Sequence, residues 1–320
     1  MNASAKYQKN VQAAALRTGF KKKKRKKLDL LDIIIYIVLT LLAVSIIIPI
    51  YHVILVSLAS NRTYMTNPGM MFLKPSDITL INYKYIFESP ILATGYKSTL
   101  FITVLGTVYG MSITLLAAYA LSRPAYPGKK LFFVLFILIP MYFGGGMIPA
   151  YLNLRDLGLL NKQITIVIMM GVSGFNMLII KSNIEQMPEG LLEAARLDGA
   201  SELVIFVRIV LPLQLPIIAT FSLFTAVGYW NEWFWPMMVL DKSEQWPLPL
   251  VLRAVVNSGI GNFQDAASES MQSYKNLQDS VSATGTTMAT LFMTMLPIMV
   301  TYPFLQKYFV KGTLVGAIKM

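Results

Sequence analysis

Cysteine is absent from this 320-residue sequence, and histidine occurs once, at His52. The lack of cysteine excludes disulfides, thiolate metal sites and cysteine nucleophiles, and a single histidine argues against a histidine-based metal site. Charged residues are also scarce, at 14% against the ~25% that is usual in soluble domains. Because 55% of the residues are hydrophobic, a soluble chain of this length could not bury enough of them. The composition therefore indicates a protein whose solvent is the bilayer.

Six stretches without a charged residue are long enough to cross a bilayer, which takes about 20 helical residues. They are residues 33–58, 98–121, 131–154, 163–180, 209–231 and 281–306. The runs are continuous and lack the short alternation of a membrane barrel, so we expect helices. The predicted fold class is all-α, a polytopic membrane protein with six transmembrane helices. The glycines at 144–146 predict a break in the third of them.

Basic residues set the expected orientation of these spans. Ten of the 28 lysines and arginines precede Leu28, next to the first apolar run, which is too long for a signal peptide. We interpret residues 1–27 as a basic cytoplasmic tail that contacts anionic lipid, without nucleic-acid binding. The transmembrane domain, 28–320, then has a cytoplasmic C-terminus and a long extracytoplasmic loop at about 241–280. Outside the tail the counts for the two sides are equal, so the orientation depends on the tail.

The predicted cytoplasmic connection at about 187–212 has a helical composition and defined ends. Pro188 suits the start of a helix, where its missing N–H needs no partner. Gly199 can adopt a positive φ and end that helix, and Ser201 can cap a second short helix. The residues predict a helix–turn–helix bracket at the membrane face, and by composition alone they favour an amphipathic interfacial connector without further function.

The spacing inside this bracket is more specific. Glu193-Ala194-Ala195, then Gly199 and Ile209, then Leu211-Pro212, resembles the EAA loop of bacterial ABC importer permeases. The resemblance implies a type I importer permease fold in a bacterial cytoplasmic membrane, with a cytoplasmic coupling helix that docks onto an ATPase subunit. The ATPase-coupling residues that it implies are Glu193, Ala194, Ala195, Asp198 and Gly199.

Three further segments are similar to carbohydrate importers. Tyr229–Trp233 resembles a Trp-Asn-Glu-aromatic stretch of sugar permeases, and Phe143–Tyr151 and Gln306–Gly312 are similar to the branch that imports polysaccharide-derived oligosaccharides. The resemblance implies a second permease subunit, with a heterodimer expected, a pair of ATPase subunits and an extracytoplasmic solute-binding protein. The chain lacks a GxxxxGK[ST] phosphate loop, so we expect ATP and Mg²⁺ on the ATPase, no cofactor in this chain and no enzymatic activity.

Aromatic and amide side chains are the groups that hold an uncharged sugar, and they gather near residue 230. With helical spacing, Thr225, Gly228, Tyr229 and Glu232 are expected on one face that lines the solute path. The fourth span adds two candidates beside its glycines. The full set of predicted path residues is Thr225, Gly228, Tyr229, Trp230, Asn231, Glu232, Trp233, Phe175 and Asn176. An aromatic belt at the membrane interface, and glycines that only let helices approach, explain the same residues without a path.

Other functions fit less well. A secondary transporter usually carries coupling ionisable groups and internal repeats, and neither is evident. An intramembrane enzyme lacks a catalytic set, since no cysteine or paired intramembrane acids are present. The predicted function is the permease subunit of an ATP-driven oligosaccharide importer, and the alternative is an importer permease for a non-sugar solute. The particular sugar cannot be read from the sequence.

Overall fold

The computed structural model describes residues 29–123, 127–258, 281 and 283–317. The basic tail at 1–27 and most of the predicted loop at 241–280 lie outside these residues. Within them the chain is helical and forms no strand beyond an isolated antiparallel bridge between Ala59 and Ile78. The chain divides into two compact units, Met1–Tyr51 and His52–Met320, and the coupling-loop and solute-path candidates belong to the second.

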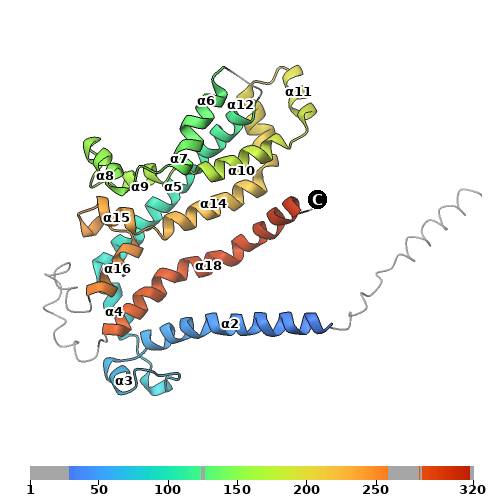
Figure 1. Ribbon diagram of the computed structural model, residues 1–320. Coiled ribbons are helices and arrows are strands. Elements are labelled where there is room, and N and C mark those ends of the chain that lie inside the picture. Colours follow the sequence, from blue (N-terminus) through green and yellow to red (C-terminus); the bar gives the residue numbers. More distant parts are fainter. Residues whose placement is uncertain (1–28, 124–126, 259–280, 282, 318–320) are drawn as a thin grey trace, which may run out of the picture. The chain divides into compact units, whose positions relative to one another are not determined.

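Figure 1 shows the helices of the described residues. In chain order they are α2 (Leu30–Ser57), α3 (Asn61–Thr66), η1 (Pro75–Asp77), α4 (Ile81–Glu88), α5 (Pro90–Ser122), α6 (Lys129–Phe133), η2 (Val134–Leu138), α7 (Ile139–Tyr142), α8 (Met147–Asp156), α9 (Gln163–Met169), α10 (Gly174–Glu185), α11 (Glu189–Leu197), α12 (Glu202–Ile205), η3 (Phe206–Val210), α13 (Leu211–Leu213), α14 (Leu215–Trp230), α15 (Phe234–Val239), η4 (Ser243–Gln245), α16 (Leu248–Ser258) and α18 (Ala283–Ala317).

Three helices of the described residues are long and apolar enough to cross a membrane. They are Leu30–Ser57, Pro90–Ser122 and Thr284–Pro303, which match the first, second and sixth predicted spans. Two bent pairs qualify if each counts as one span. The first joins α9 to α10 at 49°, and the second joins Glu202–Leu213 to α14 at 81°. The structure therefore supports three spans, or up to five.

The third predicted span is interrupted where its glycines predicted a break. Helix α7 ends at Tyr142 and α8 begins at Met147, so residues 143–146 separate the two. Gly146 has φ 85°, a left-handed value that a residue with a side chain adopts at a cost. The predicted break is thus confirmed, and neither flanking piece is long enough to span by itself.

Helix α5 is the element around which the second unit is packed. It begins at Pro90, after Ser89 at the N-cap position, and its 33 residues extend about 50 Å. Helices α9, α10, α14 and α16 all contact it (Figure 1). Gly106 and Gly110 lie one turn apart on α5, and a methyl group on Gly106 would come within 2.5 Å of the Tyr229 ring. On Gly110 it would come within 2.5 Å of the carbonyl oxygen of Gly171. The two glycines therefore allow α14 and the α9–α10 break to approach α5 closely.

We expect Gly106→Ala to lower the stability of the protein, because the new methyl group overlaps the Tyr229 ring and packed interiors do not yield freely. Overpacking of this kind typically costs about 1–3 kcal/mol. The matched control is Gly228→Ala in α14, since a Cβ there meets no atom within 4 Å. Thermal unfolding of the detergent-solubilised chain measures both variants, and equal midpoints would contradict the close contact.

Candidate coupling loop and solute path

The connection between α10 and α12 folds into the bracket that its sequence predicted. Helix α11 begins after Pro188, which occupies the N-cap position, and Asp198 is its C-cap. Gly199 has φ 79°, so it adopts the left-handed conformation that ends the helix. The N–H of Gly199 donates to the carbonyl of Arg196 and that of Ala200 to the carbonyl of Ala195, both at 3.0 Å. This pair of bonds is the Schellman motif, and it confirms the helix end at Gly199.

The second helix of the bracket differs from the prediction in one detail. Ser201 occupies the N-cap position of α12 with an extended backbone, but its hydroxyl makes no capping bond. The first turn is instead closed by the Ile205 N–H, which donates to the Ser201 carbonyl at 3.0 Å. The predicted position is therefore confirmed, and the predicted side-chain cap is wrong. The π-helical segment η3 follows and leads into the sharp turn before α14.

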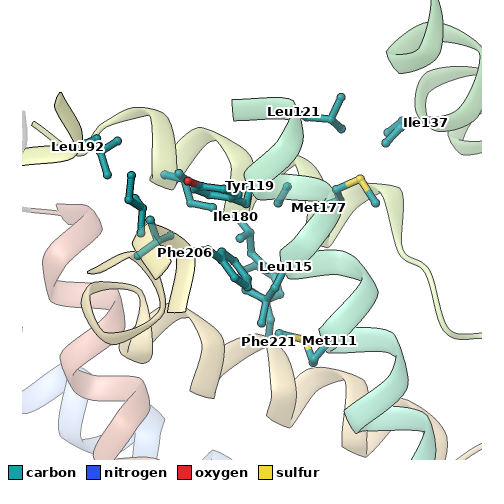
Figure 2. Close-up of a cluster of buried hydrophobic side chains, with 14 residues drawn as sticks. Met111, Leu115, Tyr119, Leu121, Ile137, Met177, Ile180, Leu192, Phe206 and Phe221 are labelled. Atoms are coloured by element: carbon teal, nitrogen blue, oxygen red, sulfur yellow. The ribbon is translucent and has the colours of Figure 1, made fainter. Parts of the chain in front are cut away.

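Helix α11 has one buried and one exposed face. Leu192 is 5% exposed and belongs to a buried apolar cluster that also holds Leu115 of α5, Ile180 of α10 and Phe221 of α14 (Figure 2). On the other side Glu193 and Ala194 are exposed, and the side chain of Leu197 is 89% exposed. The cluster anchors α11 to α5, α10 and α14, while the outer face of α11, which includes the apolar side chain of Leu197, has no cover in the described chain.

A polar contact fixes the bracket to the end of α5. The Glu202 carboxylate accepts a hydrogen bond from Arg196 Nε at 2.8 Å and another from the Tyr119 hydroxyl at 2.5 Å. The Tyr119 ring packs against Phe206 with centroids 5.0 Å apart and lies beneath the Arg123 guanidinium at 4.4 Å. The hydrogen bond to Glu202 raises the pKa of Arg196. Sequence reasoning missed this group, because its members are far apart along the chain and no motif joins Tyr119 to Glu202.

We expect Glu202→Gln to loosen the bracket, since the neutral amide replaces both charge-assisted bonds by weaker ones. Hydrogen exchange of the α11 and α12 amides should become faster, while exchange in the middle of α5 stays unchanged. Glu185→Gln is the control, because Glu185 pairs with Lys181 on the neighbouring helix α10 at 2.7 Å and leaves the bracket intact. Unchanged exchange in the Glu202 variant would show that the apolar cluster alone holds the loop.

The helical face predicted for residues 225–232 needs a correction. Helix α14 ends at Trp230, so Glu232 cannot share a helical face with Thr225 and Gly228. Its carboxylate instead accepts the N–H groups of Phe234 and Trp235, at 2.8 and 2.9 Å, and so caps the start of α15. Tyr229 is also not on an open face. It is 1% exposed, and its hydroxyl donates to the Val167 carbonyl at 2.8 Å.

The exposed face of α14 passes through other residues. Gly228 and Asn231 are exposed, as are Phe224 and Val227, and this spacing of three and four residues marks one helical face. Of the remaining predicted path residues, Trp230 is 7% exposed, and its indole N–H has no acceptor among the described residues. The structure thus places Gly228 and Asn231 on the exposed face of α14 and Tyr229 on its buried side.

Of four further predicted path residues, three have local partners. The Thr225 hydroxyl lies 3.9 Å from the Met111 sulfur on α5. Trp233 is covered by Arg253 of α16, whose guanidinium lies 3.7 Å from the Trp233 ring centroid. Phe175 and Asn176 lie in the first turn of α10, where Phe175 is exposed and the Asn176 N–H donates to the Ser173 hydroxyl at 3.3 Å. None of the contacts named for Thr225, Trp233 and Asn176 involves Asn231.

A family of known proteins matches nearly the whole chain. Residues 13–315 match the model of the binding-protein-dependent transport system inner membrane component. The chain belongs to this family. Protein LplC of Bacillus subtilis is similar to this permease, with 37% identity over 85% of this chain and 89% of that protein. The polygalacturonan/rhamnogalacturonan transport system permease protein YtcP of Bacillus subtilis is 35% identical over 91% of this chain and 98% of its own.

A solved structure shares the fold of this permease. A chain of a bacterial ABC transporter involved in the import of the acidic polysaccharide alginate superposes with a TM-score of 0.76 and 33% identity. The match covers 87% of this chain and 95% of the other. The all-α importer permease fold is therefore confirmed. As a member of this family the chain is a transport subunit of an ABC importer and not an enzyme.

Proposed function

We propose that this permease is the transmembrane subunit of an ATP-driven oligosaccharide importer and forms half of its translocation path. The observation that carries the proposal is the braced helix α11, which presents Glu193, Ala194 and Leu197 outward from a bracket whose sequence resembles the EAA loop. The names of the relatives support a carbohydrate cargo, since polygalacturonan, rhamnogalacturonan and alginate are all polysaccharides.

The coupling step would be carried by α11 as a lever. Its outer face would dock onto an ATPase subunit, where the exposed Leu197 side chain gains apolar cover. Its inner face is held by Leu192 in the buried cluster and by the Arg196–Glu202–Tyr119 contact. A displacement of α11 by the ATPase would then move the end of α5 with it, because rigid contacts transmit a shift that a loose loop would absorb.

The assembly would place this bracket on the cytoplasmic side of a bacterial cytoplasmic membrane. We infer both termini on that side and six spans, with the broken segment around 143–146 contributing to the third. A second, different permease subunit would complete the path, two ATPase subunits would bind ATP and Mg²⁺, and an extracytoplasmic solute-binding protein would deliver the sugar. The basic N-terminal run supports this orientation.

The solute path would follow the exposed face of α14. Gly228 leaves room beside the helix, Asn231 offers an amide for sugar hydroxyls, and Phe224 offers an aromatic face. Trp230 lies next to this face in sequence but is buried, so we do not count it among the groups that contact the solute. Glu232 would act by positioning the α15 turn, since its carboxylate is occupied by two backbone N–H groups.

Co-purification tests the proposal as a whole. The tagged chain, expressed in its own host with its gene neighbourhood intact, should retain a pair of ATPase subunits and a second permease. Reconstituted with the solute-binding protein, the complex should hydrolyse ATP faster when an oligosaccharide is present. A chain that purifies without any ATPase, or that transports without ATP, would contradict the proposal.

We expect Leu197→Asp to reduce oligosaccharide uptake by at least about tenfold, because burying a charge in an apolar docking site without a partner costs more than the 1.4 kcal/mol that a tenfold change requires. The ATPase should also be lost from the purified complex, while membrane insertion is unchanged. Leu157→Asp is the matched control, since Leu157 is a 63% exposed leucine at the end of α8. Equal uptake in the two variants would remove the docking role of α11. Glu193→Lys and Gly199→Asp should abolish uptake likewise.

A large side chain at Gly228 should obstruct the path. Gly228→Phe is expected to lower uptake without lowering the thermal stability, because a Cβ added at this glycine would meet no atom within 4 Å. ATPase co-purification should persist, which separates this defect from loss of docking. Gly190→Phe, at an equally open glycine on α11, is the stability control. Normal uptake by the Gly228 variant would show that this face contacts lipid or another subunit instead.

A further inference from the structure

The loop between α2 and α4 forms an open pocket that the proposed solute path does not use. Its base is fixed by the bridge between Ala59 and Ile78 and by the Thr79 N–H, which donates to the Leu58 carbonyl at 2.8 Å. The Asn82 side chain, fully buried, donates to the carbonyls of Ser57 and Ala59 at 3.0 and 2.8 Å. The loop therefore holds a defined shape.

The pocket has the size of a small-molecule site. Its volume is about 610 Å³, and it lies between α3, the following turn and η1. Small-molecule sites commonly have about 300–1,000 Å³. A specific protein–protein contact instead needs roughly 1,200 Å² or more of buried surface, which a concavity within one loop does not offer. The dimensions favour a ligand of one or two sugar rings over a protein partner.

The lining carries an excess of positive charge. Arg62 and Lys74 are exposed, and neither forms an ion pair among the described residues. Asp77 is the acidic residue of the lining, and its carboxylate accepts a hydrogen bond from the Ser76 hydroxyl at 3.1 Å. A guanidinium fork and an ammonium group that face one concavity suit a carboxylate.

The rest of the lining suits the remainder of a sugar. Thr63 and Thr66 contribute hydroxyls and Asn67 an amide, which match ring hydroxyl groups. Phe72 also lines the pocket with a side chain that is 83% exposed, and its ring offers an apolar face to the C–H side of a sugar. Charge, hydroxyl partners and an aromatic face thus occur together.

We propose that this pocket is an accessory binding site for a carboxylated sugar, such as a uronic acid unit of an oligosaccharide. The inference rests on the proposed function in taking a saccharide as cargo. The loop precedes the start of α5, and the bracket is attached at Tyr119 near the end of that helix. The pocket therefore lies at the opposite end of α5 from the coupling loop, on the side where an imported solute arrives.

Binding to the full chain in nanodiscs of uncharged lipid tests this site. The probes are digalacturonic acid, its dimethyl ester, which keeps the hydroxyls but loses both charges, and acetate, which has only the charge. We expect digalacturonate to bind most tightly. Arg62→Ala/Lys74→Ala should weaken its binding by at least about tenfold, the change expected from losing hydrogen bonds to a charged group. Lys84→Ala is the control, since Lys84 is exposed on α4 outside the lining.

Several outcomes would overturn the proposal. They are equal affinity for the acid and its ester, equal affinity for acetate, and unchanged affinity in the double variant. Loss of solute-binding-protein docking in the double variant, with sugar binding intact, would assign the pocket to that protein. Phe72→Ala should also weaken digalacturonate binding. Because Phe72 is exposed, this variant is expected to fold, so it tests the site even if the double variant misfolds. Failure of ATPase co-purification alone would contradict the proposed function and leave this site standing.

Discussion

The contact between Tyr229 and Gly106 is the constraint on which the arrangement of the second unit depends. The absent side chain on α5 admits the Tyr229 ring, and the ring's hydroxyl then reaches the Val167 carbonyl at 2.8 Å. One side chain of α14 thereby joins α5 and α9, and satisfies a backbone carbonyl near the bend between α9 and α10. In a bilayer a backbone carbonyl needs a hydrogen-bond donor from the protein, because the hydrocarbon region contains no water that could donate to it. The same contact fixes the rotation of α14, so that Phe224, Val227, Gly228 and Asn231 form its exposed face.

At the other end of α5, the coupling loop is attached by two different kinds of contact. Leu192 enters the apolar cluster, and Glu202 receives hydrogen bonds from Arg196 and Tyr119. The apolar contact is not directional, whereas the hydrogen bonds fix the orientation of α11 about its own axis. Together they leave Leu197 pointing outward. A loop held in this way is connected rigidly to the helices of the second unit, as the proposed coupling role requires.

The breaks in the helices show how far sequence reasoning reached. The glycines at 144–146 predicted a break in the helix, and the helix is broken at these residues. Glycine adopts the φ of 85° seen at Gly146 without a steric cost. The Schellman end at Gly199 was predicted for the same reason. By contrast, the end of α14 at Trp230 carried a weaker signal, since Asn231 ends helices less strongly than glycine and Glu232 favours a helix. Glu232 therefore does not share the face expected for it with Thr225 and Gly228, and Tyr229 is absent from that face for a different reason, because its ring is buried against Gly106.

By itself the sequence determined the membrane environment, the helical class and the family resemblance of the coupling loop. Hydrophobic runs and gapped motifs are local properties, and local properties are what a sequence displays. Only the tertiary structure decided which side of α14 is open, that Glu232 caps α15, and that Tyr119 and Glu202 meet across 83 positions of the chain. It also showed the open pocket lined by Arg62 and Lys74. These features depend on packing between distant segments, where the close approach at a glycine or the burial of one ring sets the rotation of a whole helix.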